Sequence, residues 1–170
     1  CAVVRYGNVL GSRGSVVHRW RDQVAMGIPL MLTDARMTRF IITLSAAVRY
    51  VLDVLDRIEG GEIFVPVLPS VRLMDLAAAI GGDGYPIAYV GLRPGGEKLQ
   101  EALLSDDEPT RTRYLAADRA LYAVAPSVCT WRDACAGWLG TPVDSALRYV
   151  SDGSHGWLSA ADLRILLEET

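Results

Sequence analysis

The sequence predicts an α/β fold. Short apolar runs alternate with segments of helical spacing along most of the chain, which is the order expected of a mainly parallel sheet with crossing helices. Glycine and proline separate these segments, and both residues mark the ends of regular elements. The chain has 170 residues, of which 51% are hydrophobic, so it contains enough apolar material to bury a core.

The first predicted strand is the apolar run of residues 1–6, which ends at Gly7 and Asn8. A run this apolar is typical of a central strand in a parallel sheet, and ligands favour the loop that follows such a strand. Ser15 then stands at the N-cap of a predicted helix over residues 15–26. The helix N-terminus after this loop favours anions.

The middle of the chain continues the alternation. Two short strands are predicted at 30–32 and 39–43. Residues 45–58 carry an apolar stripe at helical spacing, and residues 62–67 return as a strand. Ser70 is the predicted N-cap of the next helix.

The last third is less regular. A strand at 86–90 precedes a glycine-rich loop at 91–96 and a short predicted helix at 98–104. From 105 to 158 the sequence shows no strong periodicity. A Ser-x-x-Asp capping box that starts at Ser159 then predicts a closing helix.

Composition excludes several classes of protein. The net charge of -3 and the pI near 5.4 argue against nucleic-acid binding, which needs a basic surface. The cysteines, Cys1, Cys129 and Cys135, form no C-x-x-C pair, so neither a disulfide framework nor a zinc site is predicted, and a reducing cytoplasm fits best. His18 and His155 lack metal-ligand spacing. No run reaches the ~18 apolar residues of a transmembrane helix.

Three segments carry residues suited to anion binding. Residues 5–17 combine small residues with Asn8 and Arg13 before a helix, whereas 34–40 and 91–101 place arginines beside a strand and around a turn. Sixteen of the 17 basic residues are arginine, whose planar guanidinium binds phosphate through two hydrogen bonds. Taken singly, each segment also fits a purely structural loop. Neither a complete G-x-G-x-x-G motif nor a Walker loop is present.

Together, the segments RYGNVLGSRGS, TDARMTRF, GGEIFVP and GLRPGGEKLQE resemble, in this order, the inverting UDP-N-acetylglucosamine 4,6-dehydratases. These enzymes belong to the extended short-chain dehydrogenase/reductase superfamily and serve bacterial surface-sugar biosynthesis. The closing SDGSHGWLSAADLRILL is similar too. The resemblance implies that residues 1–170 form a single C-terminal substrate-binding portion, with the last strands of a Rossmann sheet and a smaller domain. It also implies that the N-terminal Rossmann cofactor domain is absent.

The resemblance also implies site residues. Asn8 would contact the sugar nucleotide, and the segment from Arg13 to Val17 would lie along it. Arginines would approach the diphosphate and a glutamate would hold the ribose hydroxyls, as their chemistry allows. Tyr6 and Gly7 would pass close to the nicotinamide of NADP. The implied substrate-binding residues are Asn8, Arg13, Ser15, Val16, Arg39, Arg93 and Glu97.

The implied reaction is that of a lyase. NADP accepts a hydride from C4 of the hexose, water is eliminated across C5 and C6, and the hydride returns to C6 with inversion at C5. The superfamily's base is the tyrosine of a Tyr-x-x-x-Lys pair. Lys98 is the only lysine and Pro94 stands four residues before it, so the pair is absent. We therefore assign no catalytic residue, expect the isolated chain to be inactive, and expect the start at Cys1 to be a truncation.

Other interpretations are also compatible with the sequence. The chain could be a non-catalytic protein that binds nucleotide sugars or assists assembly, using Asn8, Arg39 and Arg93. It could also be a fragment of a sugar-nucleotide epimerase or reductase. The pair Gly95–Gly96 has one glycine more than the family's usual motif, which shifts Glu97 and fits a decaying gene fragment. Family members commonly form oligomers, so a homo-oligomer of the whole enzyme is implied.

Overall fold

The structure is a computed structural model, and it describes residues 1–91, 97–116, 120–128, 140–153 and 156–170. The chain forms two compact units. Unit 1 contains Cys1–Tyr6, Ser45–Leu68 and Ala102–Val150, and unit 2 contains Gly7–Leu44, Pro69–Glu101 and Ser151–Thr170. Each unit is therefore assembled from segments that are far apart in the sequence.

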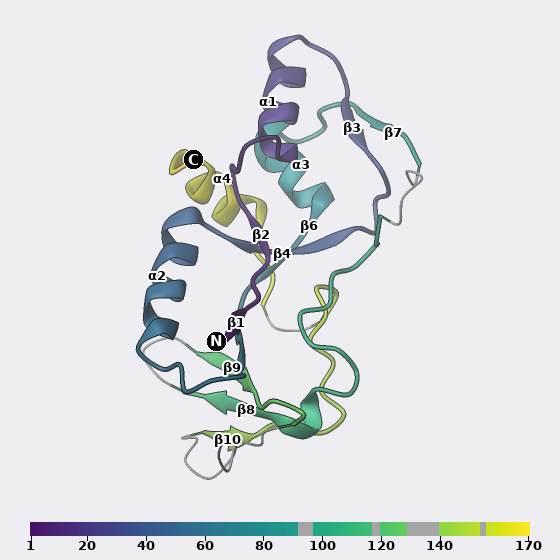
Figure 1. Cartoon of the computed structure of the whole chain (residues 1–170). Helices are drawn as coiled ribbons and strands as arrows, with labels where there is room; N and C mark the ends of the chain where they lie inside the picture. The colour runs from purple at the N-terminus through teal and green to yellow at the C-terminus, as the bar shows by residue number, and fades with distance from the viewer. Residues whose placement is uncertain (92–96, 117–119, 129–139, 154–155) are drawn as a thin grey trace. The chain divides into compact units, whose positions relative to one another are not determined.

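In its described residues, unit 1 is a five-stranded sheet with one helix against it (Figure 1). β1 pairs in parallel with β5, and every other pairing is antiparallel. The helix α2, Leu44–Leu55, packs Tyr50 and Val54 against Phe64 and Leu121. In sheet order the strands are β1 (Val3–Val4), β5 (Ile63–Pro66), β9 (Leu121–Val124), β8 (Thr112–Leu115) and β10 (Thr141–Pro142), and a short 3-10 turn, Pro109–Arg111, precedes β8.

The described part of unit 2 contains two small sheets and three helices. α3 packs between α1 and α4 (Figure 1). Their inner faces bury Val17, Trp20, Leu76 and Leu163 in one apolar core. The elements are β2 (Asn8–Val9), β4 (Thr38–Ile42) and β6 (Ser70–Arg72) in the first sheet, β3 (Leu30–Leu32) and β7 (Ile87–Tyr89) in the second, and the helices α1 (Val16–Ala25), α3 (Leu73–Gly81) and α4 (Ala160–Glu168).

The α/β class is confirmed, and so are the elements with strong local signals. The strands predicted at 30–32, 39–43, 62–67 and 86–90 appear as β3, β4, β5 and β7. The closing helix begins with the predicted capping box, in which the Ser159 hydroxyl accepts a hydrogen bond from the Asp162 amide. These elements depend on neighbours in the sequence, so a local pattern suffices to find them.

Two predictions were wrong. Ser70 is not an N-cap, because it lies in β6 and pairs with Phe40 of β4, and Arg72 is the residue before α3. Residues 98–104 form no helix. The stretch after 105, in which no element was predicted before the closing helix, contains the antiparallel strands β8, β9 and β10, and their pairing is decided by partners distant in sequence. β1 pairs in parallel with β5, as predicted for a strand of a parallel sheet, and it lies at the edge of the sheet that the described chain forms.

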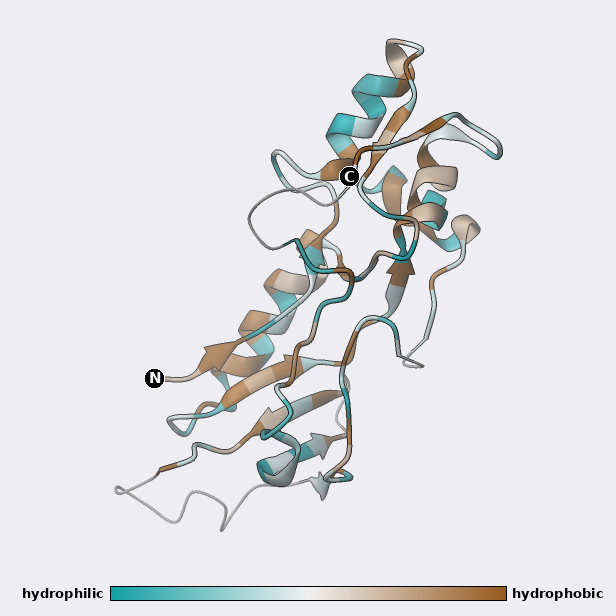
Figure 2. Ribbon diagram, turned by 90° about the vertical axis from the view of Figure 1, so that its right-hand side faces the viewer, coloured by the Kyte–Doolittle hydropathy of each residue, from teal (hydrophilic) through white to brown (hydrophobic). Residues whose placement is uncertain are grey.

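The apolar stripe predicted on α2 also faces another way than expected. The residues that α2 buries are Ala47, Tyr50 and Val54, whereas Val48 and Leu52 of the stripe are 51% and 57% exposed. In Figure 2 the strand beside the N-terminus is hydrophobic along its length, yet Val3 in it is 53% exposed. Unit 1 thus carries apolar residues on both faces of α2.

Candidate functional site

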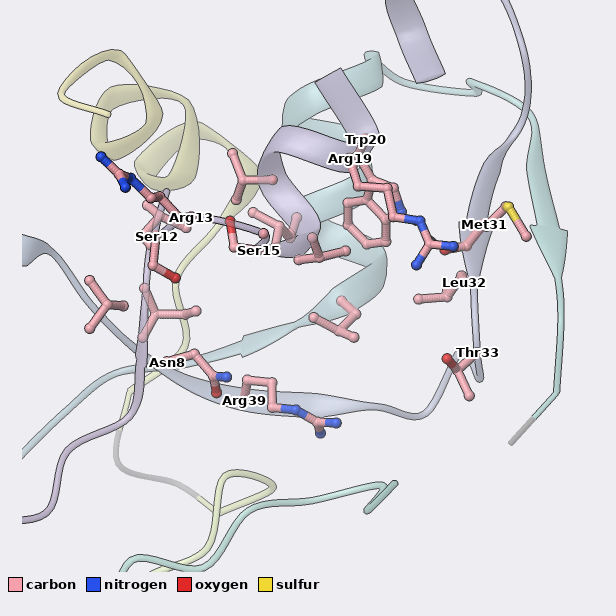
Figure 3. A pocket seen from close by; sticks show the side chains of 18 of the residues that line it. Asn8, Ser12, Arg13, Ser15, Arg19, Trp20, Met31, Leu32, Thr33 and Arg39 are labelled. Carbon is pink, nitrogen blue, oxygen red and sulfur yellow. Dashed lines mark hydrogen bonds between the residues drawn. The ribbon is translucent and has the colours of Figure 1, made fainter. Parts of the chain in front are cut away.

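Unit 2 contains a cavity of about 420 Å³ (Figure 3). Its walls come from β2, the loop after β2, the first turns of α1, β3, β4 and the start of α3, together with Glu97. Six of the residues predicted to bind substrate line it: Asn8, Arg13, Ser15, Val16, Arg39 and Glu97.

Asn8 and Arg39 share one face of the β2–β4 sheet. Asn8 pairs with Ile41 in parallel register, and Arg39 stands two residues before Ile41, so all three side chains project to the same side. Figure 3 shows the Asn8 amide beside the Arg39 side chain. The Arg39 guanidinium donates to the carbonyls of Thr38 and Leu99 at 2.7 and 3.1 Å and lies 3.7 Å from a Glu101 carboxylate oxygen. These bonds hold the cation in a fixed direction at the cavity.

Gly7, just before β2, lies against β4, and the loop after β2 is tied to α1. A Cβ at Gly7 would overlap the backbone of Phe40, so only glycine allows this approach. Gly14 has φ of +73°, a conformation that glycine adopts without strain. The His18 ring nitrogen Nε2 donates to the Gly11 carbonyl at 2.8 Å and ties the loop to the helix. His18 therefore has a structural contact in this loop.

The N-terminus of α1 opens onto the cavity. Ser15 occupies the predicted N-cap position, but its side chain makes no capping hydrogen bond, which corrects that part of the prediction. Its hydroxyl oxygen is instead buried and has no hydrogen-bond partner within the described chain. The first turn of α1 has no acidic residue, so the positive end of the helix dipole is not neutralised there. A ligand anion would find unpaired donors at this end.

A carboxylate also lines the cavity. The Thr33 hydroxyl, at the end of β3, donates to Glu97 Oε2 at 3.2 Å. Glu97 is partly exposed and lines the cavity with Thr33. A carboxylate oriented in this way accepts hydrogen bonds from hydroxyl groups of a ligand. The cavity thus combines donors for an anion with an acceptor for hydroxyls.

The other predicted residues lie elsewhere. Arg93 is outside the described residues, as is the pair Gly95–Gly96. Tyr6 is 40% exposed, and neither it nor Gly7 lines the cavity. Arg13 lines the cavity, but Figure 3 shows its guanidinium pointing away from Arg39.

The sequence reasoning missed several residues of the cavity, among them Arg19, Trp20 and Thr33. Trp20 is fully buried, and its indole Nε1 donates to the Met31 carbonyl at 3.0 Å, which joins α1 to β3. Arg19 follows the Ser15 N-cap by four residues, and this spacing from a predicted anion-binding helix end was an available signal. This spacing alone could not place Arg19 in the cavity, because it does not show which side of α1 faces β3.

Among the described residues, Gly7 was predicted to pass close to a dinucleotide, and its surroundings test this. The space beside the Gly7 Cα is occupied by Phe40, so Gly7 leaves no room for a cofactor on that side. Within the ranges that the structure covers, no three His, Cys, Asp or Glu side chains lie close enough to hold a metal ion. The same part of the chain has no helix long and apolar enough to cross a membrane.

Comparisons with known proteins agree with these motifs. The chain is 36% identical over 99% of its length to UDP-N-acetylglucosamine 4,6-dehydratase (inverting) of Campylobacter jejuni subsp. jejuni serotype O:23/36 (strain 81-176), and covers 51% of that protein. It is 37% identical over 66% of its length to UDP-glucose 4-epimerase of Rickettsia canadensis, covering 34% of it. The chain therefore spans about half the length of the dehydratase it matches.

A solved structure and a family model complete the comparison. The X-ray structure of Pen from Bacillus thuringiensis matches with a TM-score of 0.80 and 28% identity, over 99% of this chain and 49% of that one. The model of the polysaccharide biosynthesis protein family matches residues 1–121. Since this match covers more than half of the chain, the chain belongs to the polysaccharide biosynthesis protein family.

Proposed function

We propose that this chain is the substrate-binding part of an NADP-dependent 4,6-dehydratase that acts on UDP-N-acetylglucosamine in bacterial surface polysaccharide biosynthesis. The observation that carries the proposal is the shared cavity of unit 2, which is lined by six residues that the sequence motifs select. The similarity to dehydratases over 99% of the chain supports the choice of substrate.

The cavity suits the diphosphate, the ribose and the sugar of a UDP-sugar. Arg39 and the N-terminus of α1, with the unpartnered Ser15 hydroxyl, bind the diphosphate through charge-assisted hydrogen bonds. Glu97 accepts hydrogen bonds from the ribose hydroxyls. Asn8 donates to and accepts from the polar groups of the sugar, since its amide offers both kinds of atom. In this proposal Arg93 completes the diphosphate contacts.

NADP supplies the hydride chemistry of this reaction when bound. Its part in the proposal rests on kinship, because the sequence has no Tyr-x-x-x-Lys pair and no complete glycine-rich motif. The residues of this chain bind and orient the sugar nucleotide, and none is assigned a catalytic role. The chain by itself is therefore expected to bind the substrate without converting it.

Isothermal titration of the purified chain tests the proposal. We expect UDP-N-acetylglucosamine to bind, NADP not to bind tightly, and Arg39→Gln to weaken the UDP-sugar at least about tenfold through loss of a charged hydrogen bond. Asn8→Ala should weaken UDP-N-acetylglucosamine but leave UDP unchanged. Arg49→Gln, an exposed arginine of unit 1 that does not line the cavity, is the matched control. Tight NADP binding, or equal losses in Arg39→Gln and Arg49→Gln, would contradict the proposal.

A UDP-sugar 4-epimerase is a second candidate. It is favoured by the identity of 37% to the Rickettsia canadensis epimerase over 66% of this chain. Titration with UDP-glucose beside UDP-N-acetylglucosamine separates the two functions, because an epimerase portion should bind UDP-glucose at least as tightly as UDP-N-acetylglucosamine. A clear preference for the N-acetylated sugar supports the dehydratase.

A further inference from the structure

Arg19 is a charged residue of the cavity whose side chain forms no polar contact with the described chain. It lies on α1 and its side chain is exposed, and it makes no side-chain hydrogen bond or ion pair with any described residue. Arg21 on the same helix, in contrast, donates to the Leu167 carbonyl at 2.6 Å. Figure 3 shows the Arg19 guanidinium beside β3, near Met31 and Leu32.

The charge of the cavity lining calls for an anion. Arg13, Arg19 and Arg39 are the cations among the described lining residues and Glu97 is the one anion, and with Glu101 lying 3.7 Å from Arg39 a net charge of +1 remains. Arg19 also stands near the positive end of the α1 dipole, where a cation is unfavourable unless an anion lies close to it. Figure 3 shows Arg19 and Arg39 both extending toward β3, whereas Arg13 extends to the opposite side. The positive charge thus comes from two separate elements, α1 and β4.

We propose that Arg19 is a second phosphate-binding residue of this cavity, which together with Arg39 selects a ligand with two phosphate groups over one with a single phosphate. This inference rests on the proposed function. Arg39 is anchored by backbone carbonyls and provides a fixed cation. Arg19 has no such anchor, so its guanidinium is available to form hydrogen bonds to phosphate oxygens. Helix α1 then contributes to affinity through both its N-terminus and this side chain.

Titration of UDP, UMP and uridine into the whole chain and its variants tests this role. Arg19→Ala should weaken UDP at least about tenfold, weaken UMP less, and leave uridine unchanged. Arg19→Lys should restore part of the loss, because lysine keeps the charge but not the paired donors. Since the side chain makes no hydrogen bond or ion pair within the described chain, far-UV circular dichroism and the melting temperature should stay as in the unmodified protein.

The outcomes separate the two proposals. If the unmodified chain binds UDP and Arg39→Gln weakens it, but Arg19→Ala does not, the inference about Arg19 is overturned and the proposed function stands. If Arg19→Ala weakens UDP and UMP equally, the diphosphate preference is overturned. If the unmodified chain binds no UDP, the proposed function fails, and the role of Arg19 fails with it.

Discussion

Glu108 is the clearest example of a charge placed by the fold of unit 1. Its side chain is 4% exposed and accepts hydrogen bonds from both terminal nitrogens of Arg5, at 2.7 and 2.9 Å. The Ser105 amide donates to it at 2.8 Å. Burial alone would raise the pKa of Glu108, but the hydrogen bonds from Arg5 and Ser105 outweigh burial and lower it. Glu108 is therefore ionised in the folded chain and joins the loop that contains it to the end of β1.

This contact should make stability depend on acid pH. Because the folded pKa of Glu108 is below that of an unfolded glutamate, about 4.3, its contribution is complete above that value and is lost as the pH falls through the folded pKa. We expect Glu108→Gln to lower the free energy of unfolding by about 2 kcal/mol at pH 7, with a smaller decline toward pH 3. Urea unfolding at several pH values measures both effects.

Asp56→Asn serves as the control for this change, since Asp56 is exposed on the surface of unit 1. Curves of the same slope for Glu108→Gln and the unmodified chain below pH 5 would show that the Arg5 contact contributes nothing.

At the scale of single elements, two helices of unit 2 begin with serine but differ in how they are capped. At α4 the Ser159 hydroxyl accepts from the Asp162 amide at 3.2 Å, and the Asp162 carboxylate accepts from the Ser159 amide at 2.9 Å. At α1 the Ser15 side chain makes no capping bond. The donors at the start of α1 therefore remain available at the cavity, whereas those of α4 are partly used by the helix itself.

Paired substitutions test this difference. Ser159→Ala should lower the free energy of unfolding by about 1 kcal/mol, the usual contribution of an N-cap bond. Ser15→Ala should lower it by less than half as much, because no capping bond is lost, while it weakens UDP binding. Thermal or urea unfolding of both variants measures the first effect. Equal destabilisation by both substitutions would contradict the assignment of α1 as uncapped.

Considering the described chain as a whole, α2 has apolar residues on two faces. Its buried face carries Tyr50 and Val54, and its outer face exposes Leu44, Val48, Leu52 and Leu55 by 65%, 51%, 57% and 58%. Exposed apolar groups of this size on a helix favour association and dye binding. Helices that are apolar on all sides are usually buried on all sides.

The outer face should govern how the purified chain behaves in solution. Replacing Val48 and Leu52 with lysine should reduce binding of a hydrophobic dye and light scattering, and change the free energy of unfolding by no more than about 0.5 kcal/mol. Val54→Ala, on the buried face, should lower that free energy by more than about 1 kcal/mol and leave dye binding in the folded state unchanged. Dye binding that is unaffected by the two lysine substitutions would mean that the dye does not bind to the outer face of α2.

Elements and motifs that depend on near neighbours could be predicted from the sequence. The α4 capping box, the strands between glycine and proline turns, and the α/β alternation all follow from local propensity and spacing. The motifs also indicated Asn8, Ser15, Arg39 and Glu97 as candidate substrate-binding residues, and these residues line one cavity.

Which side chains lie together could not be predicted from the sequence and depends on the tertiary structure. The register of β2 on β4 places Asn8 and Arg39 on one face, and the packing of α1 against β3 turns Arg19 toward the same cavity. It also decided that Ser70 extends as a strand and that β8, β9 and β10 pair across weakly patterned sequence. Pairing and burial depend on contacts between segments far apart in the chain, and no local pattern encodes those contacts.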